Sequence, residues 1–145
     1  MATMNKPKYF TLQELLTSST ARQKSIENLP DWEIIEHLNE LALFLDGIRE
    51  AWGSGIHVNS GFRCKKLNDA IKGSSPTSVH MVGFAADIVP VNGRFEEFGR
   101  FLKNYLKDKK FDQLLIETSG KSRWYHIGLY SNSGEQRRQI KNIAA

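Results

Sequence analysis

Apolar side chains recur every three to four residues along two stretches of the chain, and this spacing predicts amphipathic helices. The longer stretch begins after Pro30-Asp31 and ends at Gly53, residues typical of a helix start and a helix end. Its apolar positions are Ile34, Ile35, Leu38, Leu41, Ala42, Leu45 and Ile48. The second stretch runs from about residue 94 to residue 107 and carries Phe98, Phe101, Leu102 and Tyr105. We expect the longer helix to form the centre of the core.

Two shorter helices are predicted from the residues at their ends. Thr11-Leu12-Gln13-Glu14 has the spacing of a capping box, in which the two outer side chains satisfy each other's backbone amides, and this helix should end by Ser18. Residues 64–72 carry Leu67, Ala70 and Ile71 on one side, and Gly73 closes the segment.

Four short segments have the alternation or the composition of strands, at residues 56–59, 85–91, 111–118 and 124–130. The last two flank Ser119-Gly120-Lys121-Ser122, which has the length of a hairpin connection. Because helices come mainly first and strands mainly late, the expected class is α+β, with helices packed on a small, largely antiparallel sheet. We find no repeat and no linker of low complexity. We therefore expect one domain over residues 1–145, with residues 131–145 as a basic C-terminal tail.

The composition is that of an ordinary globular domain, since 40% of the 145 residues are hydrophobic and 25% are charged. The longest apolar run, around residues 41–45, is far shorter than the roughly 20 residues that cross a bilayer, so we expect no membrane span. Cys64 is the only cysteine, which excludes an internal disulfide, and we interpret it as a small buried residue. The N-terminus lacks the apolar segment of a secretion signal, so we expect cytoplasmic synthesis, followed by release or export by another route.

The net charge of +4 lies entirely in the C-terminal part of the chain. Of the 20 basic and 16 acidic residues, five basic and one acidic follow Gly120, which leaves 15 of each before it. A basic end suits nucleic acid, anionic lipid or an anionic cell-wall polymer. Nucleic-acid binding is the weakest of these interpretations, because the body is neutral and no basic stripe with interleaved aromatic residues precedes the tail.

Three polar residues in the second half of the chain have the composition of a catalytic zinc site. His80 lies in a predicted loop, seven residues before Asp87 of a predicted strand, with little side-chain bulk between them. His126 supplies a second imidazole from a later strand. Two histidines and one carboxylate leave one position for water on a tetrahedral zinc ion. On spacing alone, the alternative stays open that His80 and Asp87 only share a hydrogen bond and that His126 is a solvated strand residue.

The parity of the last two strands brings a further carboxylate to the side of His126. The apolar residues of its strand have odd numbers, so His126 faces away from them. In the partner strand Leu114 and Ile116 are core candidates, which places Glu117 on the face of the histidine. Asp112 is a competing carboxylate, but it shares the parity of Leu114 and Ile116 and should face elsewhere.

The other two histidines carry weaker signals. His37 lies inside the long predicted helix, and we interpret it as a surface or half-buried residue without a role. His57 alternates with the apolar residues of its strand and points away from the core or into a cleft, so its role stays open.

Three motifs follow one another in a familiar order. They are Ser60-Gly61-Phe62-Arg63, then Ser78-x-His80-x-x-Gly83-x-Ala85-x-Asp87, then Glu117 before Trp124-Tyr125-His126-Ile127. In this order the chain resembles the zinc D-Ala-D-Ala carboxypeptidases, whose relatives include vancomycin-resistance dipeptidases, phage L-alanyl-D-glutamate endolysins and the zinc site of hedgehog signalling domains. The resemblance spans nearly the whole chain, from Phe10 to Tyr130. It implies a hedgehog-like fold and one Zn2+ ion bound by His80, Asp87 and His126.

The resemblance also implies roles for other residues. Several relatives place the catalytic acid three residues before the last ligand, where this chain has Arg123, whereas Glu117 resembles the arrangement in shorter carboxypeptidase-like and phage members. Glu117 would then move the proton from the attacking water to the leaving amine. Arg63 would hold a substrate carbonyl or carboxylate and stabilise the oxyanion. Ser78 and Trp124 are expected to contact substrate, although Ser78 is as well suited to stabilise its loop and Trp124 to pack.

Together these expectations describe a zinc-dependent peptidase that acts on peptidoglycan stem peptides as a monomer, of the phage or prophage endolysin type. The activity would be that of a D,D-carboxypeptidase, a D,D-endopeptidase or an L-alanyl-D-glutamate endopeptidase, and the sequence leaves this choice open. The alternative is a zinc-stabilised wall-binding or signalling module without turnover.

Overall fold

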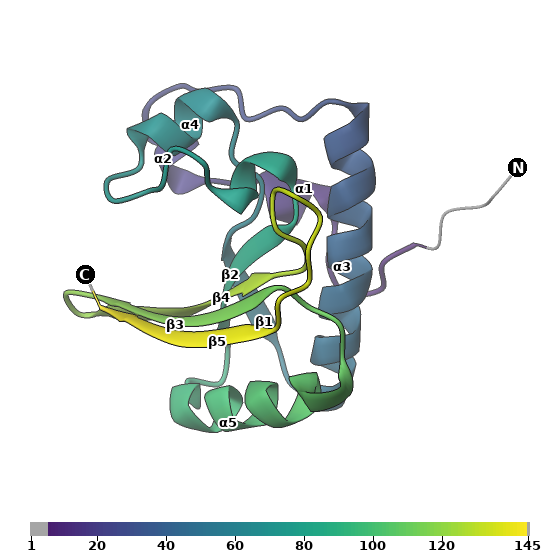
Figure 1. Ribbon diagram of the computed structural model, residues 1–145. Coiled ribbons are helices and arrows are strands. Elements are labelled where there is room, and N and C mark those ends of the chain that lie inside the picture. The colour runs from purple at the N-terminus through teal and green to yellow at the C-terminus, as the bar shows by residue number, and fades with distance from the viewer. Residues whose placement is uncertain (1–5, 145) are drawn as a thin grey trace, which may run out of the picture.

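The chain forms a five-stranded sheet with helices around it (Figure 1). The computed structural model describes residues 6–144. The helices are α1 (Leu12–Leu16), α2 (Ser19–Gln23), α3 (Trp32–Trp52), α4 (Lys65–Ala70) and α5 (Phe95–Tyr105), with 3-10 turns η1 (Val79–Val82) and η2 (Leu106–Asp108). The strands are β1 (Ile56–Ser60), β2 (Ala85–Pro90), β3 (Gln113–Ser119), β4 (Ser122–Gly128) and β5 (Gln139–Ala144). The α+β class is confirmed.

The sheet has the strand order β1-β2-β4-β3-β5. The pairs β1–β2, β2–β4 and β3–β4 are antiparallel, as expected for a largely antiparallel sheet, and β3–β5 is parallel. No helix among residues 6–144 is long and apolar enough to cross a membrane.

The predicted start of α1 and both predicted ends of α3 are confirmed by their caps. The Asp31 carboxylate accepts a hydrogen bond from the Ile34 amide at 2.9 Å, and Gly53 adopts the left-handed conformation that ends α3. Thr11 caps α1 through the amide of Glu14 at 3.1 Å. Cys64 is partly exposed rather than buried, because it lies at the start of α4, where its sulfur accepts from a backbone amide.

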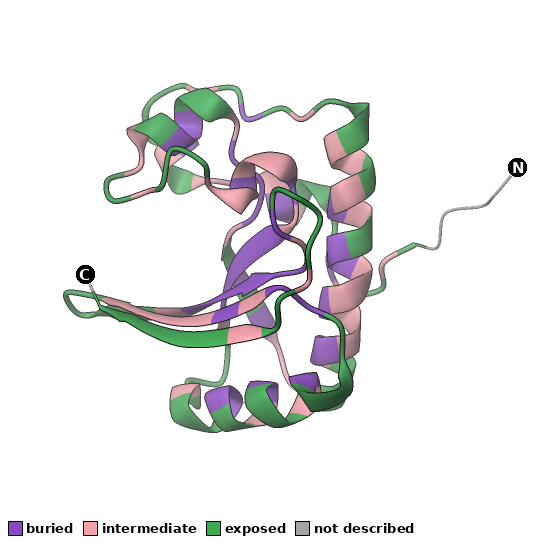
Figure 2. Cartoon of the chain, viewed as in Figure 1, coloured by how far each residue is buried: buried purple, intermediate pink, exposed green. Residues whose placement is uncertain are grey.

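The apolar core lies between one face of the sheet and the two longest helices (Figure 2). Helix α3 buries one side against it, and α5 contributes Phe98 and Leu102. From the sheet, the alternate residues Ala86 and Ile88, Tyr125 and Ile127, and Leu114 point into this core. The intervening residues of β2, β3 and β4 therefore face the other way, and this second face carries the polar side chains considered below.

The C-terminal segment is part of the sheet. Residues 131–145 were assigned no element from the sequence, yet β5 pairs with β3 along its whole length. The two arginines that precede β5 bind the body of the domain. Arg137 forms an ion pair with Asp112 at 2.8 Å, and the guanidinium of Arg138 donates to the carbonyl oxygens of Leu106 and Lys107. Two of the charges in the basic tail thus stabilise the fold.

Candidate metal centre

The sheet register places three of the predicted site residues on one face. Asp87 of β2 lies directly opposite His126 of β4, and His126 lies opposite Leu115 of β3. Two residues further along, Glu117 lies opposite Trp124. Directly opposed residues in antiparallel strands share a face, so Asp87, His126 and Glu117 project to the same side. The structure therefore confirms the prediction that Glu117 and His126 lie on the same face of the sheet.

His80 reaches this face from η1, where the sequence predicts a loop. The Ser78 hydroxyl accepts a hydrogen bond from the His80 backbone amide at 3.2 Å and caps the turn. Gly83 ends the turn at φ +84°, and a Cβ there would lie 3.1 Å from the Ile34 side chain and 3.2 Å from its carbonyl oxygen. The tight passage against α3 therefore requires glycine, and it returns the chain to β2 so that His80 faces Asp87.

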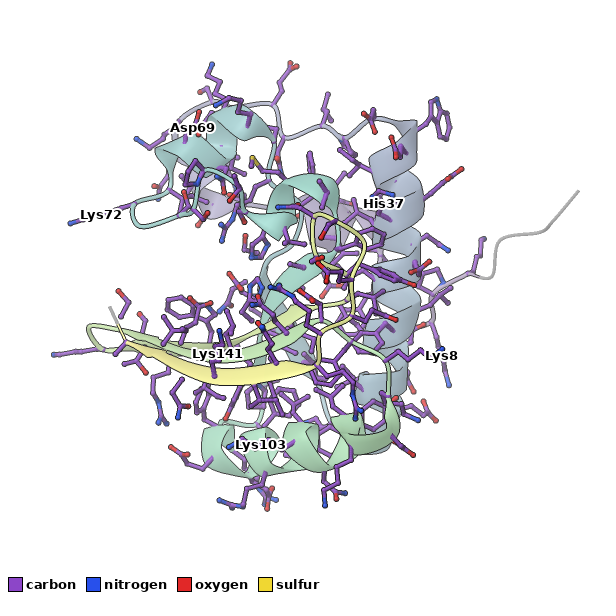
Figure 3. All side chains as sticks on the ribbon, viewed as in Figure 1. Lys8, His37, Asp69, Lys72, Lys103 and Lys141 are labelled. Atoms are coloured by element: carbon purple, nitrogen blue, oxygen red, sulfur yellow. The ribbon has the colours of Figure 1, made fainter. Side chains whose placement is uncertain are left out.

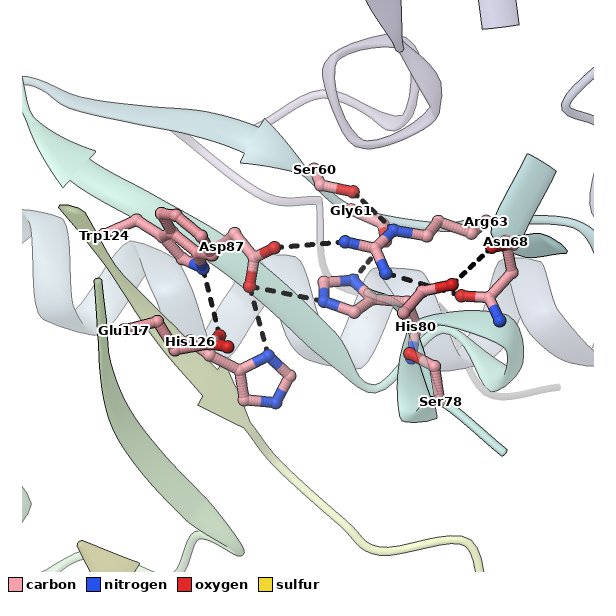
Figure 4. A network of polar contacts seen from close by, with 11 residues as sticks. Ser60, Gly61, Arg63, Asn68, Ser78, His80, Asp87, Glu117, Trp124 and His126 are labelled. Atoms are coloured by element: carbon pink, nitrogen blue, oxygen red, sulfur yellow. Dashed lines mark hydrogen bonds and ion pairs between the residues drawn. The ribbon is translucent and has the colours of Figure 1, made fainter. Parts of the chain in front are cut away.

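One carboxylate oxygen of Asp87 is the centre of the group (Figure 4). Asp87 Oδ1 lies 3.3 Å from His80 Nε2 and 3.1 Å from His126 Nδ1. The three ligand atoms all lie within 4.8 Å of one another. A tetrahedral zinc ion with bonds of about 2.0–2.2 Å separates its ligand atoms by roughly 3.3–3.6 Å. The distances from Asp87 Oδ1 to the two imidazole nitrogens are close to this spacing.

The hydrogen bonds of His80 also suit a metal. Its Nδ1 lies 2.7 Å from the carbonyl oxygen of Gly61, which can only accept, so Nδ1 carries the proton. Burial lowers the pKa of His80 and outweighs the opposite effect of Asp87, so the ring is neutral and Nε2 presents a lone pair. A lone pair that faces a carboxylate oxygen at 3.3 Å is unfavourable unless a cation lies between them. The donor set therefore fits a metal ion.

Asp87 is held ionised by its neighbours. Burial alone would raise the pKa of Asp87, but attraction between its carboxylate and a positively charged His80 or His126 ring outweighs burial and keeps the pKa below its ordinary range. A metal ion bound by the neutral rings would supply the same positive charge. The second oxygen, Oδ2, accepts a hydrogen bond from Arg63 at 3.2 Å. The two oxygens of Asp87 thus have different partners: Oδ1 faces the imidazoles and Oδ2 binds the arginine.

Arg63 is fixed by a buried polar network. Burial lowers its pKa, against the raising effect of Asp87 and Glu117, and a guanidinium remains charged at neutral pH. It donates to Ser60 at 3.0 Å and to the amide oxygen of Asn68 at 3.4 Å, in addition to Asp87. These bonds use three of its five N–H groups.

All the predicted site residues line one cleft of about 410 Å³. They are Arg63, Ser78, His80, Asp87, Glu117, Trp124 and His126. The Trp124 indole donates to Glu117 Oε2 at 3.0 Å, so this tryptophan orients the carboxylate as well as forming a wall (Figure 4). The loop after α4, at residues 71–78, forms the opposite wall. The arrangement combines a metal-binding group, a carboxylate and an arginine in one concave site.

The family model for Peptidase M15 matches residues 8–128. The chain belongs to the peptidase M15 family. This is the family of the zinc D-Ala-D-Ala carboxypeptidases, so the resemblance read from the sequence motifs is confirmed. A search of curated proteins found no match. Since M15 enzymes are zinc-dependent metallopeptidases, the group of His80, Asp87 and His126 is the candidate zinc site of this chain.

Other candidate residues lie outside the M15 site. The Asp112 carboxylate is bound by Arg137, and Arg123 forms an ion pair with Glu96 at 2.6 Å. His57 is exposed on β1. His37 Nδ1 donates a hydrogen bond to the Val82 carbonyl oxygen at 2.7 Å, because a carbonyl can only accept, and this bond ties α3 to η1.

Sequence reasoning missed three residues that support the M15 site. Gly61 supplies the carbonyl that sets the His80 tautomer, and a Cβ on Gly61 would lie 2.4 Å from the Leu15 carbonyl oxygen. Asn68 is fully buried and joins Arg63 to the Ser75 carbonyl. Asn28 accepts from the Cys64 amide and donates to the Phe62 carbonyl. For Gly61, the signal was its place in the Ser-Gly-Phe-Arg motif, whereas nothing local marks the two asparagines as buried.

Proposed function

We propose that this M15 protein is a zinc peptidase that hydrolyses the stem peptides of bacterial peptidoglycan. The observation that carries the proposal is the convergence of His80, Asp87 and His126, whose ligand atoms lie within 4.8 Å of one another, in a cleft that Glu117 also lines. The proposal assigns these three side chains to one Zn2+ ion. Zinc bound there would act as a Lewis acid on the scissile carbonyl and lower the pKa of the attacking water.

The proposal makes Glu117 the general base and then the general acid. Its carboxylate accepts a proton from the attacking water as the water oxygen bonds to the carbonyl carbon. It returns that proton to the amine as the carbon–nitrogen bond breaks, so the proton count balances. The hydrogen bond from Trp124 at 3.0 Å fixes one carboxylate oxygen and leaves the other for this transfer.

Arg63 has a double role in this proposal. Its bond to Asp87 orients a metal ligand, and its two remaining N–H groups bind the substrate carbonyl or carboxylate and stabilise developing negative charge. Ser78 and Trp124 contact the substrate from the walls of the cleft that they line. Ser78 also caps η1, so its hydroxyl serves the fold and the site together.

The biological setting that we propose is cell-wall degradation by a phage or prophage endolysin. The enzyme would work as a monomer, would be made in the cytoplasm and would reach the wall after release. The cleaved bond is either D,D or L-alanyl-D-glutamate. Mass spectrometry of muropeptides from digested cell walls names the bond directly, because each cut gives a different product mass.

Replacement of Glu117 tests the mechanism. Glu117→Gln keeps the shape of the side chain and removes the base, so the rate of peptide-bond hydrolysis should fall about 10²- to 10⁴-fold. Zinc content should stay at that of the wild type, because Glu117 is not assigned as a ligand. The rate is measured as new amine released from purified peptidoglycan with zinc supplied, and the zinc content by elemental analysis.

Glu97→Gln is the matched control, since Glu97 is an exposed carboxylate on α5 that pairs with Arg94. It should hydrolyse at the wild-type rate. An unchanged rate in Glu117→Gln would exclude Glu117 as the base. A zinc-loaded wild type that pellets with cell walls but releases no amine would replace the peptidase with the alternative of a binding module.

A further inference from the structure

Two cations, one on the wall of the cleft and one on the strand next to it, have no partner for their charge. Lys72 lines the wall formed by the loop after α4, and Lys141 lies on β5. Within residues 6–144, neither ammonium group forms an ion pair or a hydrogen bond. Both side chains are exposed. Figure 3 shows Lys72 on the loop after α4 and Lys141 on the sheet.

The register of the sheet fixes the position of Lys141. His126 lies opposite Leu115, and Leu115 lies opposite Lys141, so the three residues form one row across β4, β3 and β5. Leu115 lines the cleft, and residues in register on neighbouring strands share a face. Lys141 therefore belongs to the face of the metal-binding group, two strand spacings from His126, or about 10 Å.

Three other cations near these two lysines already have partners. Arg63, at the bottom of the cleft, is bound to Asp87. Arg137, shortly before β5, is bound to Asp112. Lys65, on the helix before Lys72, pairs with Asp69 at 2.9 Å. Lys72 and Lys141 thus differ from these neighbours, because their charges are available to a ligand.

We infer that Lys141 and Lys72 bind free carboxylates of the peptide substrate, and that the cleft selects anionic peptides. The inference rests on the proposed function and deepens it. An extended peptide advances about 3.3 Å per residue, so a peptide that crosses β3 toward β5 places a carboxylate about three residues from the cleaved bond over Lys141. The flexible four-carbon stem of each lysine lets the ammonium follow that carboxylate.

The expected contribution of the two lysines to substrate binding is modest, because both side chains are exposed. An exposed ion pair contributes at most about fivefold to binding, so the two lysines together should contribute about 10-fold. Screening by salt should reduce this contribution, because both lysines face solvent.

The test compares the pentapeptide L-Ala-γ-D-Glu-L-Lys-D-Ala-D-Ala with the same peptide in which every carboxylate is an amide. kcat/KM is measured on both peptides for the zinc-loaded wild type, for Lys72→Ala/Lys141→Ala and for Lys103→Ala. Lys103 is the matched control, an exposed lysine on α5 (Figure 3). Amidation of the peptide should lower kcat/KM in the wild type and in the control. In the double variant the fold-decrease on amidation should be about 10-fold smaller. Lys141→Glu should reduce cleavage of the acidic peptide further than Lys141→Ala.

An equal cost of amidation in the wild type and the double variant, with the peptides cleaved, would overturn the inference and leave the peptidase proposal intact. If neither the peptides nor intact peptidoglycan are cleaved, the proposed function fails. Binding then decides the inference separately. Calorimetry on the zinc-loaded Glu117→Gln protein should still show tighter binding of the acidic peptide, and equal binding of the two peptides would refute the role of the lysines.

Discussion

Two buried aspartates of this domain have similar surroundings, but they differ in whether a carboxylate oxygen stays available to a ligand. Asp87 is 7% exposed and Asp112 is 1% exposed, and each accepts hydrogen bonds from an arginine. The pKa of each is held below its usual value, in both cases against the effect of burial. What separates them is how many of their oxygen atoms the arginine uses.

Arg137 binds both oxygens of Asp112. Its Nε lies 2.8 Å from Oδ1, its Nη2 lies 2.8 Å from Oδ2, and its backbone amide adds a third bond at 3.1 Å. Arg63 reaches only Oδ2 of Asp87 and leaves Oδ1 to two imidazole nitrogens. An arginine that binds both oxygens of a carboxylate leaves neither for a ligand. An arginine that binds only one oxygen orients the carboxylate and leaves the other oxygen for a ligand.

The largest effect should come from Asp87→Asn. The amide has nearly the same shape but no charge, so zinc affinity should fall by more than the about 10- to 100-fold that loss of an outer hydrogen-bond partner costs. Zinc affinity is measured by competition with a chelator. Asp112→Asn is the matched control and should bind zinc as the wild type does. Equal affinity in Asp87→Asn and the wild type would remove Asp87 from the ligand set.

The strand parity that brings Glu117 to the face of His126 could be read from the sequence. Alternation of apolar and polar residues in two neighbouring strands is a local signal, and a hairpin connection fixes their register. The α+β class and the ends of α1 and α3 followed from equally local patterns. The Ser-x-His-x-x-Gly-x-Ala-x-Asp motif then indicated the ligands, and the structure brings His80, Asp87 and His126 together.

The partners of the two aspartates could not be predicted from local patterns. Arg63 and Asp87 are 24 residues apart, and Asp112 and Arg137 are 25 apart, so only the folded chain brings each pair together. Strand β5 was missed for the same reason. Its exposed residues Ile140 and Ile143 give no clean alternation, and its parallel pairing depends on β3, which lies on the far side of a turn and a loop.

The next largest effect should be the loss of stability in Asp112→Asn. Removing one partner of a buried ion pair costs about 3–5 kcal/mol, and the side chain of Arg137 is 38% exposed, so we expect about 3 kcal/mol. Urea denaturation of the zinc-free protein measures this loss. Asp108→Asn, at a carboxylate whose side chain is 84% exposed, should change the free energy of unfolding by less than about 0.5 kcal/mol. Equal losses at the two positions would contradict the structural role of Asp112.

The smallest effect is the pH dependence of that difference, measured without zinc. Burial would raise the pKa of Asp112, but the hydrogen bonds and charge of Arg137 outweigh it, so the folded pKa lies below the unfolded value of about 3.9. Asp112 therefore contributes stability that is fully present above about pH 5 and is lost as the pH falls through the folded pKa. Asparagine does not titrate, so the gap in unfolding free energy between the wild type and Asp112→Asn should be constant from pH 7 to about 5.

Below about pH 4 the gap should shrink toward zero, because the protonated carboxyl and the amide are both neutral. Other carboxylates titrate in both proteins and cancel in the difference, which isolates Asp112. A gap that widens on acidification would mean that Arg137 does not stabilise the ionised form. Asp112 would then be a buried acid that does not stabilise the fold. The distinction between a carboxylate with both oxygens bound by arginine and one with an oxygen left for a ligand would then have to rest on Asp87 alone.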